Sequence, residues 1–402
     1  MSKLIVQPLK KSNVPLVIII DALDECKDKQ PVSTVLSILG QFVSEIPKAK
    51  FFVTGRPDPR IREGFRLPVL AEATDVFVLH EVEPSQVDSD VRLFFGHAFS
   101  ELARRRGGLD DWPTKEQLDL LCERTAGFFV FAVATVRFID NRSANPRTQL
   151  DLLLQSPEST AREAKTKFTR NTTLDSLYTS ILQEAFGHVG HPDNDPKVRS
   201  VLGAMILPAN PLSPSAIAKI LSLDAEDVFS LSSSVQSLLI LRGDMDCPVR
   251  PFHKSFSDFL TDPDRCTDQR FHVFPPDHHS QLFTGCLDLM VRTLDRNMCR
   301  LPDGVVNSDV HDLGKRIAKY IDPAVQYACR SWHTHLIEGP MISVKADITS
   351  ALHQFLETKL LFWLEVLSVL GTAENAVDAL QTAKGLLKVR RDSMPDELPK
   401  FS

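Results

Sequence analysis

Three acidic residues directly follow the most apolar run near the start of the chain. The run Pro15–Ile20 ends at Asp21, and Asp24 and Glu25 come three and four residues later. A buried strand that ends in carboxylates can hold Mg²⁺ and polarise a water molecule beside a bound nucleotide. In that chemistry Asp21 would bind Mg²⁺ directly or through water, and Glu25 or Asp24 would polarise the attacking water. The alternative is an acidic helix N-terminus, where carboxylates are electrostatically favoured.

A second polar group follows the next apolar segment, within Lys50–Arg60 (KFFVTGRPDPR). Parallel strands carry their C-terminal ends to one edge of a sheet. A strand at Phe51–Val53 would therefore deliver Thr54 and Arg56 to the edge at which the acidic residues emerge. A hydroxyl and a guanidinium there can bind the γ-phosphate of a nucleotide. The alternative is a Gly-Arg-Pro-Asp turn on the surface.

The glycine-rich loop that normally accompanies such carboxylates is missing from this sequence. No G-x-x-x-x-G-K-[ST] segment occurs among the 402 residues. That loop supplies the backbone N–H cradle, the lysine and the hydroxyl ligand that hold the phosphates and Mg²⁺. We therefore expect nucleotide binding by this chain to be weak and independent hydrolysis to be absent.

Composition and charge argue against several other classes of protein. The formal net charge is −6, unlike the basic footprint of a nucleic-acid binder. The seven cysteines are odd in number and include no C-x-x-C pair. That pattern favours free thiols in a reducing compartment over a disulfide framework or a zinc site. The first residues lack the apolar core of a secretory signal, and Phe128–Ile139 is too short to span a bilayer. We expect a cytoplasmic protein without a membrane segment.

Hydrophobic periodicity predicts a small α/β region followed by helices. Strands are expected at Leu16–Ile20, Phe51–Val53 and Val76–Leu79, with a helix at Pro31–Val43. This order predicts a parallel sheet of about three strands with one uncovered apolar edge. Helical patterns then cover Asp88–Arg106, Thr114–Ala126, Phe128–Asp140, Leu174–Phe186, Leu282–Leu294, Leu313–Tyr320, Ile348–Leu370 and Glu374–Val389, with a polar connector ending in a helix at Asn145–Thr166 and a loop at Gly187–Pro196.

The middle of the chain predicts a winged-helix-like module. Helical patterns at Val198–Ile206, Ser215–Leu221 and Ala225–Ser237 precede two short β-like runs, at Leu238–Leu241 and Val249–Phe252. Three helices followed by a β-hairpin is the order of that module. A winged helix can bind DNA. Lys219, however, stands nearly alone as a basic residue on the second and third helices, so DNA binding is not expected.

The acidic and basic segments resemble the NACHT branch of the STAND NTPases, in particular the large fungal group with a nephrocystin-3-like nucleotide-binding domain. PLVIIIDALDEC resembles the Walker B strand of that family, and KFFVTGRPDPRI resembles its sensor-1 strand. The segments GFFVFAVATVRFID, LDSLYTSILQEAF, PLSPSAIAKIL and VRPFHKSFSDFLTDPDRC resemble its lid, helical and winged-helix segments. CLDLMVRTLDRNMCRL and YACRSWHTHL resemble the helical region that follows, so the resemblance covers most of the chain.

The resemblance implies an ATP- or GTP-dependent molecular switch that uses Mg²⁺, often with a C-terminal repeat sensor. Carried over by position, Asp21 matches the Mg²⁺-associated acid, Asp24 and Glu25 match the second acidic pair, and Arg56 matches the sensor-1 arginine. His253 lies in a φ-H-x-S-F segment and matches the winged-helix histidine that reaches the diphosphate of bound ADP in related switches. The alternative for His253 is a capping or core histidine at a helix start.

The resemblance and the element order together predict an α/β remnant of a P-loop NTPase, with a small parallel sheet, followed by a predominantly α-helical region that includes the winged-helix-like module. The expected divisions are residues 1–83 for the C-terminal part of the NACHT core, 84–166 for the helical lid and connector, 167–262 for the winged-helix-like module, and 263–402 for a helical array.

Three functions fit this sequence. The first is a truncated NACHT/STAND-family signalling or scaffold protein with a partial nucleotide-binding site, which binds protein partners through its helical region and can self-associate. The second is a portion of an active switch whose phosphate loop lies upstream. The third, and most remote, is a winged-helix nucleic-acid binder.

Overall fold

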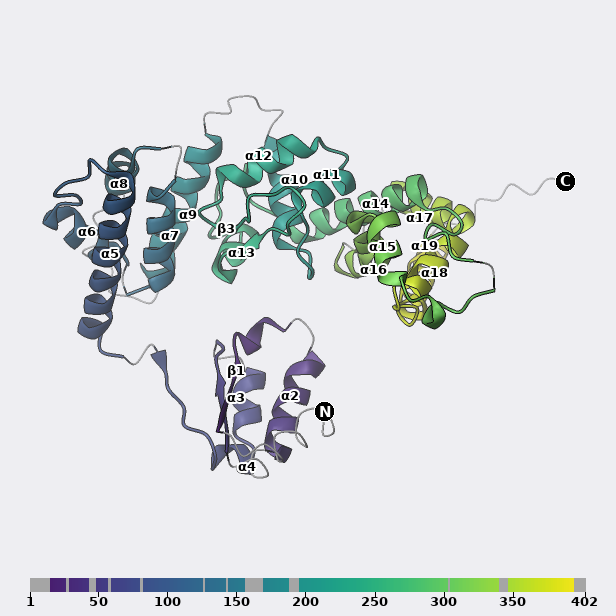
Figure 1. Ribbon diagram of the computed structural model, residues 1–402, viewed down its shortest axis with the longest axis horizontal. Helices are drawn as coiled ribbons and strands as arrows, with labels where there is room; N and C mark the ends of the chain where they lie inside the picture. The colour runs from purple at the N-terminus through teal and green to yellow at the C-terminus, as the bar shows by residue number, and fades with distance from the viewer. Residues whose placement is uncertain are drawn as a thin grey trace. The chain divides into compact units, whose positions relative to one another are not determined.

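The computed structural model divides into two compact units, Met1–Glu83 and Pro84–Ser402 (Figure 1). The structure describes residues 15–26, 29–42, 48–56, 59–79, 82–125, 127–141, 144–155, 169–187, 195–302, 304–339 and 346–393. As predicted, a small parallel sheet near the N-terminus is followed by a region that is almost entirely helical.

The first unit is built on two parallel strands, β1 (Leu16–Ile20) and β2 (Ala49–Val53), which pair from Leu16 opposite Ala49 to Ile20 opposite Val53. The helix between them is α2 (Lys29–Phe42). A right-handed crossover through a helix is the standard way to join two parallel strands. Two short helices follow β2, namely α3 (Pro59–Phe65) and α4 (Pro68–Ala71).

One face of this sheet packs on a core, whereas the described side chains of the other face are exposed. The covered face packs on a small core whose buried members are Leu23, Val32, Leu36, Leu39 and Leu70. On the opposite face Val17, Ile19 and Phe52 are each 60% exposed or more. Parallel sheets are normally covered on both faces, so the described residues build only one of the two layers that such a sheet requires.

The prediction of a third strand at Val76–Leu79 was wrong for the described residues. Residues 74–78 have no regular secondary structure, and the side chains of Val76, Phe77 and Leu79 are strongly exposed. An apolar run forms a strand only where a neighbouring strand supplies ladder hydrogen bonds. Within the part of the first unit that the structure describes, the strand order is β1–β2 alone.

The second unit opens with helices that share a large core. They are α5 (Pro84–Arg106), α6 (Lys115–Thr125), α7 (Phe129–Ile139), α8 (Pro146–Gln155) and α9 (Thr169–Phe186). Along α5 the buried residues Val91, Phe95, Phe99 and Leu102 recur at helical spacing, which makes one apolar stripe. The connector predicted at 145–166 carries its described helix, α8, at its start instead of its end, and residues 156–168 lie outside the described part.

A three-helix group with a β-hairpin follows. Its helices are α10 (Asp195–Ile206), α11 (Pro214–Leu221) and α12 (Ala225–Ser234). The strands β3 (Leu239–Ile240) and β4 (Arg250–Pro251) pair antiparallel, and α13 (Lys254–Thr261) begins three residues after β4. Most of the loop predicted at 187–196, residues 188–194, lies outside the described residues.

Arg137 of α7 joins the hairpin to the preceding helices. Its guanidinium donates to the carbonyl oxygens of Gln236, at 2.9 Å, and of Leu239. It also lies 4.5 Å from the centre of the Phe252 ring. The Arg137 side chain therefore binds one carbonyl that precedes β3, that of Gln236, and one at the start of β3, that of Leu239. It also packs on Phe252, the residue that precedes His253.

The remaining helices gather toward the C-terminal end of the second unit (Figure 1). They are α14 (Pro275–Thr293), α15 (Leu313–Tyr320), α16 (Pro323–Glu338), α17 (Ala346–Thr358), α18 (Leu360–Val369) and α19 (Asn375–Ser393). The single helix predicted over Ile348–Leu370 is two helices, because the backbone turns at Lys359 (φ −127°, ψ −1°). The Nζ of Lys359 there donates to the carbonyl oxygen of Leu294 at 2.7 Å.

Candidate functional site

The acidic segment after β1 and the Thr54–Arg56 segment after β2 meet at the same edge of the sheet, as expected. The backbone N–H of Thr54 donates to the carbonyl oxygen of Ile20 at 2.9 Å, and the N–H of Leu23 donates to the carbonyl oxygen of Thr54 at 2.9 Å. These bonds continue the β1–β2 pairing past the strand ends. They bring the segment Asp21–Glu25 against Thr54 and Arg56.

The hydroxyl of Thr54 joins two consecutive residues of the acidic segment. It donates to Oδ1 of Asp21 and accepts the backbone N–H of Ala22 at 2.9 Å. Ala22 has a left-handed backbone conformation (φ 54°, ψ 50°), which is uncommon for a residue with a Cβ. The turn lets Leu23–Glu25 form one 3₁₀ turn with Leu23 buried beneath it. Such strained residues concentrate at functional sites.

Asp24 and Arg56 form the second pair at this edge. Oδ1 of Asp24 accepts the backbone N–H of Arg56 at 3.0 Å, and Nε of Arg56 lies 3.7 Å from Oδ2. The Asp24 side chain is only 8% exposed, whereas that of Arg56 is 48% exposed. The side chains of Asp21 and Glu25 are exposed. The two acids that the sequence could not tell apart thus differ in environment, because Asp24 faces Arg56 and Glu25 faces solvent.

The charge of this edge suits a cation better than a phosphate chain. In the described part of this edge, three carboxylates, those of Asp21, Asp24 and Glu25, face one guanidinium, that of Arg56. Among the described residues, no group of three His, Cys, Asp or Glu side chains is close enough together to hold a metal ion. A Mg²⁺ at Asp21 would therefore need its other oxygen ligands from water and from a bound nucleotide, which is how Mg²⁺ is commonly held.

His253 belongs to the second unit, where it is the N-cap of α13. Its Nδ1 accepts the backbone N–H of Ser255 at 3.2 Å and lies 2.7 Å from Oγ of Ser255. The alternative named for this residue, a histidine that caps a helix start, is therefore present in the structure. Capping uses one ring nitrogen, Nδ1, and the histidine is exposed.

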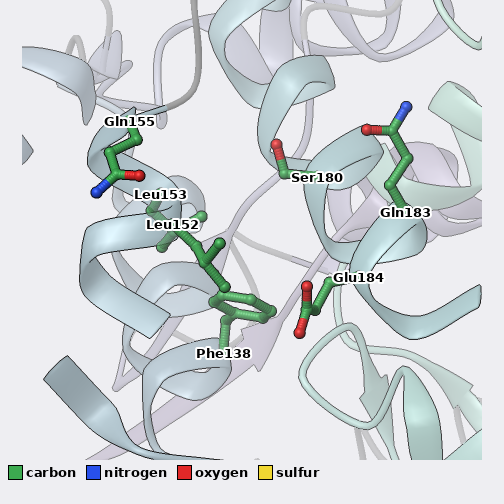
Figure 2. A pocket seen from close by; sticks show the side chains of 7 residues that line it. All are labelled: Phe138, Leu152, Leu153, Gln155, Ser180, Gln183 and Glu184. Carbon is green, nitrogen blue, oxygen red and sulfur yellow. The ribbon is translucent and has the colours of Figure 1, made fainter. Parts of the chain in front are cut away.

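A cavity of about 320 Å³ lies between α7, α8 and α9 of the second unit. It is lined by Phe138, Leu152, Leu153, Gln155, Ser180, Gln183 and Glu184, whose side chains are labelled in Figure 2. The sequence did not single out this site, because its lining is spread over three helices without a motif. One carboxylate among amides and apolar groups points to no particular chemistry.

Comparisons with known proteins agree with the sequence motifs. Residues 1–56 match the family description "Nephrocystin 3, N-terminal". The chain is 25% identical over 398 residues to the vegetative incompatibility protein HET-E-1 of Podospora anserina, and the match covers 92% of the chain. It spans 26% of the length of that relative. No solved structure gives a significant match. None of the described helices combines the length and apolar character needed to cross a membrane.

Proposed function

Both matches support a NACHT-like fungal family for this chain, and from that premise we propose that it is a NACHT-family signalling or scaffold protein with a partial nucleotide-binding site. The observation that carries the proposal is the pair of contacts at the sheet edge, between Thr54 and Asp21 and between Arg56 and Asp24. The two segments that would face a nucleotide are held in contact there, which a mere surface turn would not require.

The contacts support a division of roles within the site. Asp21 is exposed and would bind Mg²⁺, with its carboxylate oriented by the Thr54 hydroxyl. Glu25 is the exposed acid that would polarise water, and Asp24 would orient Arg56 toward a terminal phosphate. His253 would contact the diphosphate. When bound, ATP or GTP with Mg²⁺ would supply the phosphoryl chemistry, which depends on positioning and on charge stabilisation.

The proposal includes no independent hydrolysis. The sequence has no glycine-rich phosphate loop, and the described edge has more negative than positive charge. A phosphate chain needs donors to offset its charge. The backbone N–H cradle would have to come from elsewhere.

The second candidate is a portion of an active NACHT switch whose phosphate loop lies upstream in a longer polypeptide. One observation favours it: the chain spans only 26% of the length of HET-E-1. The exposed face of the β1–β2 sheet fits the same idea, because helices cover both faces of the sheet in a complete α/β domain.

Nucleic-acid binding has the least support. The net charge is −6, and Lys219 on α11 is paired with Asp322. A basic face is the electrostatic footprint that such binding needs. The proposal also includes protein partners that bind the helical region. It includes a cytoplasmic location as well, which the unpaired cysteines favour.

Isothermal titration of the full chain with ATP, ADP, GTP and GDP in the presence of Mg²⁺ tests the partial site. The expected result is no binding in the micromolar range and no phosphate release. Micromolar binding by this chain would overturn the proposal that the site is incomplete.

A longer polypeptide that carries an upstream G-x-x-x-x-G-K-[ST] segment tests the second candidate. Micromolar binding that is lost in its Asp21→Asn variant, with retention in Glu25→Gln, would favour the active switch. Glu25→Gln should instead abolish phosphate release, since its proposed role is in the chemical step.

A further inference from the structure

Three side chains from two helices form a continuous hydrogen-bonded chain that ends on His253. The hydroxyl of Tyr178 on α9 lies 2.8 Å from Oγ of Ser255, and that Oγ lies 2.7 Å from Nδ1 of His253. Tyr178 and Ser255 are 77 residues apart in the sequence. Tyr178 is 1% exposed, and its ring packs edge-on against Phe256.

The direction of every hydrogen bond in this chain follows from one backbone group. The N–H of Ser255, at 3.2 Å from Nδ1 of His253, can only donate, so Nδ1 must offer its lone pair. The Ser255 hydroxyl, facing the same lone pair, must also donate to Nδ1. Its oxygen is then left to accept, and the Tyr178 hydroxyl is the donor. The chain runs from Tyr178 through Ser255 to His253.

We propose that Tyr178 and Ser255 are positioning residues that hold His253 as the Nε2–H tautomer, so that the ring presents a neutral N–H donor on the side away from the helix cap. A neutral imidazole carries one proton, and occupation of the Nδ1 lone pair by two donors places that proton on Nε2. The two ring nitrogens point in divergent directions, so Nε2 lies on the side of the ring away from Ser255.

A simple helix cap does not require this arrangement. At α12 the cap is a single side chain, Asp224, which accepts two backbone N–H groups of its own helix. At α11 the cap Ser213 accepts a backbone N–H and contacts the hydroxyl of Ser215, which donates to the exposed Asp246. At α13 the cap is a histidine, and a buried tyrosine from another helix completes it through Ser255. The hydrogen bond made by one ring nitrogen of a histidine decides which nitrogen carries the proton.

The identity of the ligand that the Nε2–H would bind rests on the proposed function, in which His253 contacts a diphosphate. A neutral N–H donor suits a phosphate oxygen. The tautomer itself does not depend on the nucleotide. The two parts can therefore fail separately.

Long-range ¹H–¹⁵N spectra of the full chain with ¹⁵N-labelled histidine test the tautomer. The chain has 12 histidines, and the spectrum of a His253→Gln variant identifies the resonances of His253. At neutral pH the expected pattern is a protonated Nε2 and a hydrogen-bonded, unprotonated Nδ1. The backbone N–H of Ser255 remains in Tyr178→Phe and Ser255→Ala, but at 3.2 Å it is the longer of the two contacts to Nδ1, against 2.7 Å for the hydroxyl. In both variants the Nδ1 resonance should therefore move part of the way toward the average of a ring that exchanges between both tautomers.

Two variants separate positioning from folding. Ser255→Thr keeps the hydroxyl and should restore the wild-type pattern, and Ser234→Ala removes a hydroxyl that bonds only within its own helix and should change nothing. A protonated Nδ1 in the wild type, or an unchanged pattern in both Tyr178→Phe and Ser255→Ala, would overturn the inference.

Addition of inorganic pyrophosphate then tests the ligand. An Nε2 resonance that does not move, in a ring with the expected tautomer, counts against the proposed nucleotide role of His253 and leaves the positioning intact.

Discussion

The backbone N–H of Arg56 donates to Oδ1 of Asp24 at 3.0 Å, and the guanidinium Nε lies 3.7 Å from Oδ2 of the same carboxylate. Asp24 is thereby tied to the end of β2, while Glu25, one residue further, is exposed. The two adjacent acids therefore differ in role: Asp24 holds the sheet edge together, and Glu25 faces solvent.

Asp24→Asn should destabilise the first unit, because the amide is a weaker acceptor for the Arg56 N–H and loses the attraction to the guanidinium. We expect a loss of about 1 to 2 kcal/mol, since Arg56 is half exposed and solvent screens part of the pairing. Hydrogen exchange of the β1 and β2 amides in the full chain measures it. Glu25→Gln is the matched control and should change protection by less than about 0.5 kcal/mol. Equal losses in the two variants would contradict the division.

Thr54→Val should loosen the turn at Asp21 and Ala22. The hydroxyl accepts the N–H of Ala22 and donates to Asp21, and valine keeps the shape but makes neither bond. The strained conformation of Ala22 would then lose its support, at a cost of about 1 to 2 kcal/mol. Exchange of the Ala22 and Leu23 amides is the readout. Thr54→Ser, which keeps the hydroxyl, should retain most of the protection.

Arg137→Ala should weaken the attachment of the hairpin to α7. The change leaves the carbonyls of Gln236 and Leu239 without this donor and removes the contact with the Phe252 ring. We expect the free energy of unfolding of the second unit to fall by about 2 to 3 kcal/mol. Thermal or urea denaturation measures this change. Arg137→Lys should recover less than half of it, because an ammonium lacks the planar fork that serves two carbonyls and a ring together. Full recovery with lysine would show that charge alone suffices.

The stability of the second unit should fall in alkali. Burial raises the pKa of the Cys329 thiol to about 12, and burial also raises the pKa of Cys286. A raised folded pKa means that the stabilisation is complete below the unfolded value, near 9, and is lost as pH rises toward the folded value. Each such thiol contributes a slope of about 1.4 kcal/mol per pH unit in that window. Urea midpoints between pH 8 and 11 measure the slope. Cys329→Ala should reduce it, and an unchanged slope would place the titration elsewhere.

Ile19→Lys should reduce self-association. Ile19 lies on the exposed face of the sheet beside its register partner Phe52, and both are strongly exposed. An apolar sheet face in water promotes association, and a charge opposes it. Sedimentation velocity over a range of protein concentrations compares the variant with wild type. Lys50→Gln, which removes a charge from the same face, is the reverse control and should not reduce association. A wild type that is monomeric throughout would contradict the expectation.

The meeting of the acidic and basic segments could be predicted from sequence because it depends on local rules. Two apolar runs joined by a helical pattern form parallel strands, and parallel strands bring their following residues to one edge. Asp21, Asp24, Glu25, Thr54 and Arg56 were placed together on that ground alone. The helix predicted from hydrophobic periodicity at Leu313–Tyr320 has the same bounds in the structure.

Tertiary structure decided which partner each of these residues has. The pairing of Asp24 with Arg56 depends on a 3₁₀ turn that follows the left-handed residue Ala22. No pattern of residue types in the sequence predicts that turn. The segment Val76–Leu79 has the composition of a strand, yet a strand needs a neighbouring edge, which composition does not show. The relay from Tyr178 to His253 joins residues 75 positions apart through Ser255. Sequence determines such local preferences by spacing, whereas contacts between distant residues exist only once the helices have packed.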